Sequence, residues 1–322
     1  MVFSRHQCKP IDLIHHFKLF IGTPTTLRPP SPSPPASRAM ATRAERSKPA
    51  VERTHYTSQP VDIPGSFLTT PPSAPITLQR IPFADSPLPE YAGCFAVLLD
   101  NVLAPWECAK LLQLAEASVP DAEEGASPWR PALVNMGDGY EAAVTDYRNS
   151  DRIIWDSQTV VDRVWQRCLQ ARGEGEESMR EMLSGTPEGR EAKKQNRTWG
   201  GEWKFERLNE RMRFLKYTKG QFFKPHCDDA YYFAADGTTF ETHYTVHLYL
   251  NDSAKTSADG SGCVGGATSF LSHDLERRLD VDPKAGSVLI FQHEQLLHSG
   301  DEVRSGTKYT MRTDVLYRWV RE

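Results

Sequence analysis

Short runs of β-branched and aromatic residues recur from Met212 to the end of the chain, separated by Gly, Asp or Pro. Branched and aromatic side chains favour strands because they pack well on a pleated surface, and the separating residues favour turns. The runs span residues 213–218, 222–227, 244–250, 267–271, 287–291 and 308–317. A chain with several short strands of this kind is predicted to form an all-β sandwich or barrel.

A different pattern precedes these runs. Pro105 and Glu107 stand in the first turn of a segment with helical spacing, and Ser157 precedes a second such segment. Pro and Glu are favoured in a first turn, and Ser is favoured as an N-cap. The stretches 95–99 and 129–135 are expected as strands, and the charged residues 172–200 as a solvated helix or a loop. The prediction is an α+β, mainly β fold, with supporting N-terminal helices.

The first 90 residues are expected to be disordered or irregular. Six of the 23 prolines lie between Pro24 and Pro35, and such a composition buries little apolar surface. We expect order to begin near Tyr91, with a folded domain over 91–322 whose motifs lie in 205–320. Residues 1–45, which are poor in acids, are typical of a disordered tail or of a mitochondrial presequence. Whether they are retained stays open.

Charge and hydropathy argue against two classes of partner. The chain has 38 Lys and Arg against 42 Asp and Glu, a net charge of −4, so no basic surplus is available to neutralise phosphates. No run of eighteen apolar residues occurs, which argues against a membrane span. The six cysteines are scattered without a C-x-x-C pair, as is typical of reducing compartments. A cytoplasmic or nuclear protein is expected, with mitochondria as the alternative.

One predicted strand carries a motif with chemical meaning. Side chains two residues apart share a strand face, so His226 and Asp228 point the same way, whereas Asp229 points to the other side. With a distant second histidine, such a pair forms the 2-His-1-carboxylate facial triad, which binds Fe(II) and leaves coordination positions open. His298 and His293 are the candidates for the second histidine. The motif H-x-D alone is a weak signal.

Neighbouring residues strengthen this reading. Lys308 lies ten residues after His298 at the start of the last predicted strand, where a lysine can pair with a carboxylate. The chain resembles the Fe(II)/2-oxoglutarate-dependent dioxygenases, and within them the prolyl 4-hydroxylase catalytic-domain group, over roughly residues 95–319. The resemblance rests on Tyr217-x-x-Gly220-x-x-x-x-Pro225-His226-x-Asp228, Leu248-Tyr249-Leu250-Asn251, Gly265-Gly266, His298 and Lys308.

This resemblance implies a double-stranded β-helix (jelly-roll) core and an iron site. The implied ligands are His226, Asp228 and His298. His298 matches better than His293, because the family's histidine opens a strand before a glycine. Asp229 remains the weaker alternative for the carboxylate.

The resemblance also implies a co-substrate site. Lys308 would hold the distal carboxylate of 2-oxoglutarate, and Tyr217 and Tyr249 would touch this molecule. Arg312 shares a strand face with Lys308. It is expected either to take over or assist the salt bridge, or to lie exposed on the rim of the barrel.

The implied reaction is hydroxylation of an unactivated C–H bond with Fe(II), O2 and 2-oxoglutarate, which gives succinate and CO2, with ascorbate as a reductant. The expected substrate is a prolyl residue or a small molecule, with no nucleic-acid or membrane partner. Residues 229–242 are predicted to be an aromatic-rich loop that acts as a lid or substrate wall, and Arg211 and Arg213 are candidates for the pocket. A cupin-like metal enzyme and a non-catalytic jelly-roll binding module are the alternatives. The oligomeric state stays open.

Overall fold

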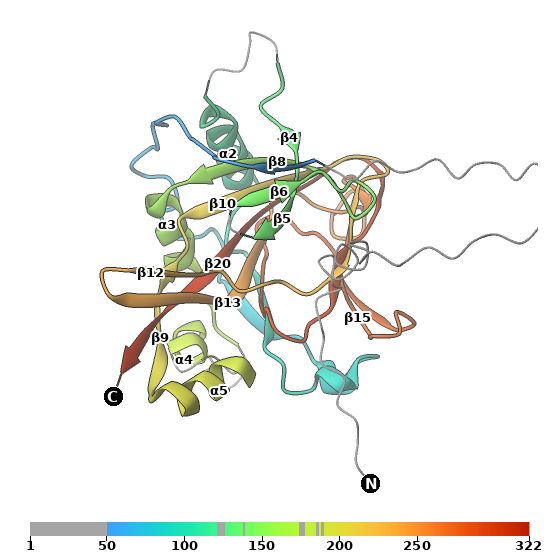
Figure 1. Cartoon of the computed structure of the whole chain (residues 1–322). Helices are drawn as coiled ribbons and strands as arrows, with labels where there is room; N and C mark the ends of the chain where they lie inside the picture. The colour runs from blue at the N-terminus through green and yellow to red at the C-terminus, as the bar shows by residue number, and fades with distance from the viewer. Residues whose placement is uncertain are drawn as a thin grey trace, which may run out of the picture.

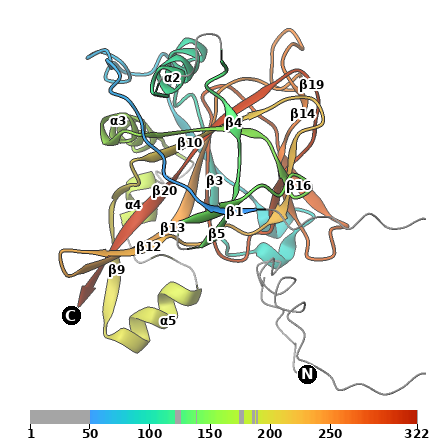
Figure 2. The same ribbon diagram turned by 45° about the horizontal axis from the view of Figure 1, so that its top comes forward.

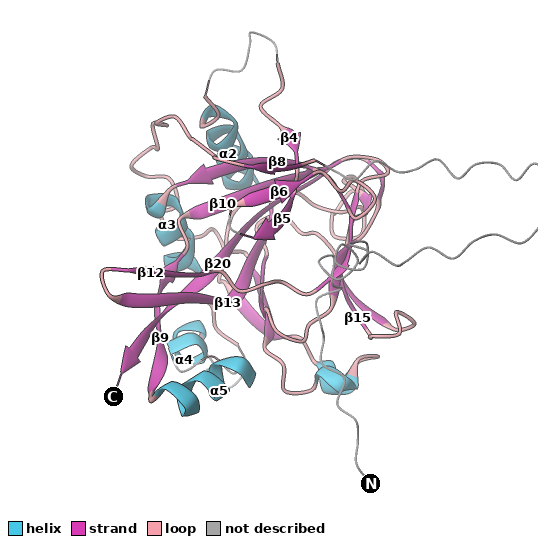
Figure 3. Ribbon diagram, in the orientation of Figure 1, coloured by secondary structure: helices cyan, strands magenta, loops and turns pink. Residues whose placement is uncertain are grey.

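The structure, a computed structural model, describes residues 50–120, 126–137, 139–173, 178–184, 187 and 190–321. Strands dominate the fold, and the helices lie beside the sheets (Figure 1, Figure 3). The helices are α2 (Pro105–Ala117), α3 (Gln158–Cys168), α4 (Met179–Ser184) and α5 (Arg190–Trp199), with 3-10 turns η1 (Phe83–Asp85) and η2 (Pro89–Tyr91). None of these helices is both long enough and apolar enough to cross a membrane.

The larger sheet is antiparallel and is built around β20 (Lys308–Arg321). This strand pairs with β13 (Thr238–Tyr249) along one edge and with β10 (Arg211–Tyr217) along the other. The sheet continues outward from β13 through β17 (Val288–Gln292) and β3 (Ala96–Asp100) to β2 (Thr77–Arg80), and from β10 through β8 (Asp151–Asp156) to β4 (Arg130–Pro131). Two further strands extend it, β12 (Tyr232–Ala235) beside β13 and β9 (Gly201–Leu208) beside β20.

A second antiparallel sheet faces the larger one. Its order is β16 (Arg278–Val281), β15 (Thr268–Leu271), β18 (His298–Gly300), β11 (Phe222–His226) and β7 (Arg148–Asn149). Buried residues of both sheets meet in one cluster, which includes Phe270 and Val281 from the second sheet and Leu289 and Phe291 from the larger one. Two packed antiparallel sheets confirm the predicted jelly-roll core.

Two small sheets complete the fold at its periphery. One pairs β14 (Val264–Gly265) with β19 (Val303–Ser305). The other contains β1 (Val51–Arg53), β6 (Tyr140–Ala142) and β5 (Val134–Gly137), in that order. Figure 2 shows β14 and β19 above the second sheet, away from α5.

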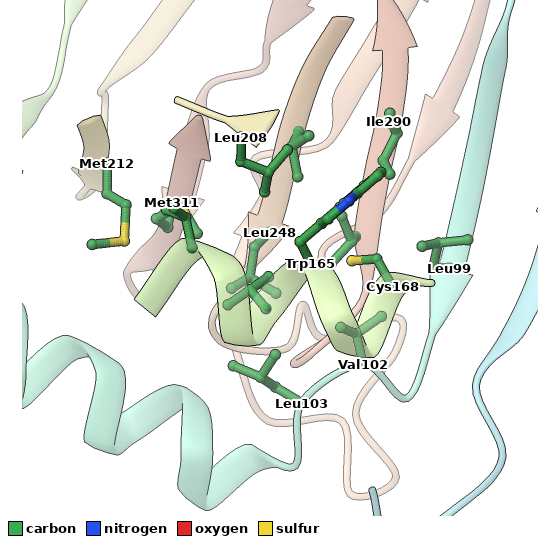
Figure 4. Packing of buried hydrophobic residues seen from close by; sticks show 14 of the residues in the cluster. Leu99, Val102, Leu103, Trp165, Cys168, Leu208, Met212, Leu248, Ile290 and Met311 are labelled. Atoms are coloured by element: carbon green, nitrogen blue, oxygen red, sulfur yellow. The ribbon is translucent and has the colours of Figure 1, made fainter. Parts of the chain in front are cut away.

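Alternation along β20 separates a structural face from a functional face. Successive side chains of a strand point to opposite faces. Met311 and Val315 belong to the main hydrophobic core, whereas Lys308 and Arg312 line a pocket between the sheets. Helix α3 covers the core face, and Trp165 of this helix packs among the strand residues (Figure 4). On β20, the apolar Met311 and Val315 therefore lie under the helices, and the charged Lys308 and Arg312 lie between the sheets.

Helices α2 and α3 begin where the sequence predicts. Glu107 accepts a hydrogen bond from the backbone N–H of Ala104 at 2.8 Å, which satisfies one free donor at the start of α2. Ser157 accepts one from Val160 at the start of α3. The same Glu107 forms a buried ion pair with Arg167 at 2.8 Å. One carboxylate therefore caps α2 and joins it to α3.

Residues 50–90, which the sequence predicts to be disordered or irregular, contain few helices or strands but pack against the core. Strand β2 pairs with β3, and Phe67, Leu68 and Leu88 are buried. A proline-rich segment forms little regular structure of its own, but it can pack on a core that other residues supply. The boundary at residue 90 therefore does not divide an ordered part from a disordered part over residues 50–90. The expectations for residues 1–45 lie outside the described residues.

Each of the six predicted strand runs overlaps one strand, in order β10, β11, β13, β15, β17 and β20, although β13 and β20 are longer than predicted. The stretch 129–135 is instead divided between β4 and β5, which belong to different sheets. The segment 229–242 is a hairpin of β12 and β13 rather than a loop. Asp236 and Gly237 both have positive φ at its turn, and Asp-Gly is a strong hairpin signal. The charged segment 172–200 contains α4 and α5.

Candidate active site

A pocket lies between the two main sheets, and side chains from both sheets line it. The larger sheet contributes residues from β10, β13, β17 and β20, and the second sheet contributes residues from β7, β11, β15 and β18. Several of these side chains are ionisable. The lining residues are Arg148, Arg213, Leu215, Tyr217, Phe223, His226, Asp228, Thr245, His247, Thr268, Phe291, His298, Ser299, Gly300, Lys308 and Arg312.

Strand pairing brings the two predicted histidines together. His226 ends β11, His298 begins β18, and the two residues are register partners in the second sheet. Asp228 follows two residues after His226, and one potential ligand atom from each of the three side chains lies within 4.8 Å of the others. Nε2 of His226 lies 3.7 Å from Oδ1 of Asp228, and Nε2 of His298 lies 3.7 Å from Oδ2. These separations are longer than a hydrogen bond, so the three side chains point towards a common position without bonding to one another there.

Both imidazoles are held with Nε2 towards that point. Nδ1 of His226 lies 2.8 Å from the backbone oxygen of Lys224, and Nδ1 of His298 lies 3.0 Å from that of Leu296. A carbonyl only accepts, so Nδ1 carries the proton and Nε2 presents a lone pair. Burial and the neighbouring His298 lower the pKa of His226 to about 3, and burial also lowers the pKa of His298. Both rings are therefore neutral at pH 7.

The carboxylate of Asp228 is anchored on both oxygens. Oδ2 accepts a hydrogen bond from the hydroxyl of Thr245 at 2.5 Å, and Oδ1 forms an ion pair with Nη1 of Arg312 at 2.8 Å. Burial opposes ionisation, but Arg312 and the two histidines together lower the pKa of Asp228 well below its usual range. Asp228 is therefore an anion with a fixed orientation.

This donor set fits a non-heme Fe(II) ion. Two neutral imidazole nitrogens and one carboxylate are the ligands of the facial-triad oxygenases. The backbone contacts at each Nδ1, and Thr245 at Asp228, are outer-shell contacts of the kind that orient metal ligands. Asp229 and His293 do not join this group. Among the described residues, the group of converging ligand atoms consists of His226, Asp228 and His298.

Lys308 lies in the same pocket without an acidic partner. Its side chain is 2% exposed, and no Asp or Glu of the described residues lies within ion-pair distance of its Nζ. Tyr217 and Tyr249 flank this nitrogen, with ring centroids 5.4 and 5.8 Å away. Burial lowers the pKa of Lys308 to about 8. A buried cation without a counter-ion is costly, so this position fits an anionic ligand such as the distal carboxylate of 2-oxoglutarate.

The two tyrosines occupy different positions. Tyr217 lines the pocket and is the cross-strand register partner of Lys308. Tyr249 is fully buried between the sheets beside the lysine, in the cluster around Phe270, and is not among the pocket-lining residues. Tyr217 is thus placed to touch a ligand at Lys308, and Tyr249 packs behind the lysine.

Three arginines were considered as pocket residues, and two of them, Arg312 and Arg211, have partners that the sequence did not predict. Arg312 does not lie on an exposed rim: its Nη1 pairs with Asp228 and its Nη2 with Asp314 at 3.1 Å, while its buried Nε has no partner among the described residues. Arg213 lines the pocket, as the sequence suggested. Arg211 does not line it and pairs with Asp156 on the outside instead.

Residues 212–314 match the family model of the 2OG-Fe(II) oxygenase superfamily. This segment belongs to the 2OG-Fe(II) oxygenase superfamily. Membership implies Fe(II), 2-oxoglutarate and O2, and it confirms the family recognised from the motifs. No curated protein matches the chain.

Several solved structures are similar to this chain. A viral collagen prolyl hydroxylase from Paramecium Bursaria Chlorella virus-1 is 19% identical, with a TM-score of 0.39, covering 70% of this chain and 97% of its own. A prolyl-4-hydroxylase of Pseudomonas putida is 16% identical, with a TM-score of 0.40, covering 70% and 95%. A prolyl hydroxylase of Trichoplax adhaerens, solved with a hypoxia inducible factor peptide fragment, is 14% identical, with a TM-score of 0.41, covering 72% and 88%.

Thr245, Arg148 and His247 are among the pocket residues that were not foreseen from the sequence. Thr245 donates a hydrogen bond to Asp228, and Arg148 stacks on Phe223 with its guanidinium carbon 4.7 Å from the ring centroid. His247, on β13 of the larger sheet, lines the pocket. Strand parity on β13 could have placed Thr245 and His247 on one face. Arg148 precedes the predicted core and had no such signal.

Proposed function

We propose that this oxygenase hydroxylates an unactivated C–H bond in a prolyl 4-hydroxylase-like reaction that converts 2-oxoglutarate to succinate and CO2. The observation that supports this most is the pairing of two features in one pocket: three converging ligand side chains and the buried, unpaired Lys308. The proposed substrate is a prolyl residue or a small molecule, with ascorbate as a reductant.

The proposed roles follow from the geometry of each side chain. His226, His298 and Asp228 would hold Fe(II), His226 and His298 through Nε2. When bound, the iron supplies activation of O2 and the redox chemistry of C–H oxidation. Lys308 would bind the distal carboxylate of 2-oxoglutarate and fix its orientation, since a charge-assisted hydrogen bond is strong in a buried site.

The surroundings of the ligands keep water away from the reacting atoms. Leu215 and Phe291 line the pocket with apolar surface, which strengthens the electrostatic contacts inside it. Tyr231 and Tyr232 are 53% and 58% exposed at the hairpin of β12 and β13, directly after the metal-binding motif. We assign this hairpin to contact with the substrate, in the role that the sequence suggested for a loop.

The direct test is anaerobic absorption spectroscopy. Fe(II) and 2-oxoglutarate added to the wild-type protein should produce a visible metal-to-ligand charge-transfer band. The band should disappear in His226→Ala and weaken in Lys308→Ala. His273→Ala and Lys255→Ala are matched controls that remove the same groups outside the pocket, and they should retain it.

The absence of a band in folded wild-type protein would overturn the proposal. It would move the assignment to another metal or to a non-catalytic binding module. A band that survives in His226→Ala would show that iron binds elsewhere. With the expected band in hand, succinate release in air would be measured with prolyl peptides and with small molecules.

A further inference from the structure

The pocket contains more positive charge than the iron and the co-substrate use. Arg148, Arg213, Lys308 and Arg312 line it, against one lining carboxylate, Asp228. Lys308 is assigned to 2-oxoglutarate, and Arg312 is paired with Asp228. Arg148 and Arg213 remain without a role in the proposed reaction.

Among the residues that the structure describes, Arg148 has no anionic partner. It lies on β7, where its guanidinium carbon is 4.7 Å from the ring centroid of Phe223. That ring in turn stacks on the imidazole of His226, with centroids 3.7 Å apart. Among the described residues its hydrogen bond runs from Nη1 to the backbone oxygen of Leu133 at 3.5 Å, and its buried Nε has no partner. The Phe223 ring therefore separates the guanidinium of Arg148 from the imidazole of His226.

Arg213 faces the same pocket from the larger sheet. Its Nη1 donates to Asp314 at 3.0 Å, and the side chain, which is 25% exposed, lines the pocket. Its cross-strand register partner is Arg312, which shares Asp314 with it. Two like charges directly opposite one another are destabilising. The carboxylate of Asp314 is thus an ion-pair partner of both Arg213 and Arg312.

We propose that the substrate carries a carboxylate, which binds between Arg148 and Arg213 while the C–H bond faces the iron site. This inference rests on the proposed function and names its substrate class. A guanidinium presents a planar fork of donors that matches a carboxylate in two parallel hydrogen bonds. An anion there would also relieve the repulsion between arginines that meet at one pocket. The carboxylate is either that of a free acid or that of an acidic residue in a peptide.

The test is calorimetric titration of the anaerobic protein loaded with Fe(II) and saturating 2-oxoglutarate, so that no turnover occurs. The probes are N-acetyl-L-proline and a short prolyl peptide with one Asp, each paired with its neutral amide. At least one acid should bind at least tenfold more tightly than its amide. Arg148→Gln and Arg213→Gln should each lower the affinity of that acid about tenfold.

Controls separate this inference from the proposed function. Arg211→Gln removes an arginine two residues away on β10 that pairs outside the pocket, and it should bind the acid like wild type. Arg213→Lys keeps the charge without the fork and should give an intermediate affinity. The charge-transfer band is recorded first for each variant, which verifies folding and the iron and co-substrate site.

Each outcome of the titrations either supports or overturns the proposed carboxylate site. Preference for the free acid or for the acidic peptide identifies the source of the carboxylate, and both support the proposal. Equal binding of acids and amides, or no binding of any probe, overturns it while the band leaves the proposed function standing. Loss of the band in Arg148→Gln or Arg213→Gln assigns these arginines to the iron and co-substrate site and also overturns it.

Discussion

The guanidinium of Arg312 and the carboxylate of Asp228 lie 2.8 Å apart, so the proposed iron ligand already has a cation beside it. Asp228 is 8% exposed, and a buried carboxylate without a counter-charge is strongly unfavourable. Arg312 therefore stabilises the metal-free protein, and a bound metal ion would supply much of the same compensation.

Arg312→Gln should destabilise the metal-free protein more than the metal-loaded one. Removing one partner of a buried ion pair costs about 3–5 kcal/mol, and the partial exposure of Arg312 places the expected loss towards the lower end. Urea denaturation with and without Mn(II) would measure both free energies of unfolding. Equal losses in the two states would show that Arg312 and the metal do not share Asp228.

Thr245→Val should weaken metal binding without unfolding the protein. The hydroxyl fixes Oδ2 of Asp228 at 2.5 Å, and loss of such an outer-shell contact reduces metal affinity about 10–100-fold. Competition with a chelator would measure the affinity. Thr245→Ser, which keeps the hydroxyl, should stay near wild type, and a valine variant with unchanged affinity would remove Thr245 from the site.

The affinity for 2-oxoglutarate should fall as the pH rises above about 8. Burial lowers the pKa of Lys308 to about 8 in the free protein, and only the protonated amine attracts a carboxylate. Binding therefore takes up a proton above this pH, and the affinity should fall by up to about tenfold per pH unit. Equilibrium titration between pH 6.5 and 9.5 would show it. Lys308→Arg should bind with a flat profile, because arginine stays charged.

Gly266→Ala should lower both stability and the affinity for 2-oxoglutarate. Gly266 has φ +71°, and an added Cβ would lie 3.2 Å from Cδ of Lys308 and 3.1 Å from Val303. The left-handed conformation costs a non-glycine residue about 1–2 kcal/mol, and the contact would displace the lysine stem.

Gly220→Ala is the matched control for this substitution. Gly220 has φ +81°, and nothing lies within 4 Å of an added Cβ. It should lose similar stability in thermal denaturation and keep its affinity for 2-oxoglutarate. A normal co-substrate affinity in Gly266→Ala would mean that the lysine tolerates the contact.

The sequence was most informative where a local rule applied. Alternation along a strand put His226 and Asp228 on one face, and turn residues separated the six runs that became strands. The hairpin after the motif could also have been predicted from Asp236-Gly237, whose backbone conformations are those of a hairpin turn.

Pairings between distant residues could not be predicted from these rules. Thr245 reaches Asp228 across 17 positions, and Arg148 reaches the pocket only because β7 pairs with β11. The partners of Arg312 depend on the register of β20 against its neighbours, which no local pattern specifies. The packing of residues 50–90 on the core was not predicted for the same reason, since β2 is held by pairing with β3.

The position of β20 has a consequence for how the protein assembles. This strand is the last in sequence among the described residues, yet it joins β13 to β10 in the middle of the larger sheet. Until it docks, the two flanks of that sheet have no common strand, and such non-local pairing makes folding slow. Lys308 and Arg312 enter the pocket together with this strand. Release of β20 would therefore remove the co-substrate cation and the partner of Asp228 in a single event, and the site would be gained or lost as a unit.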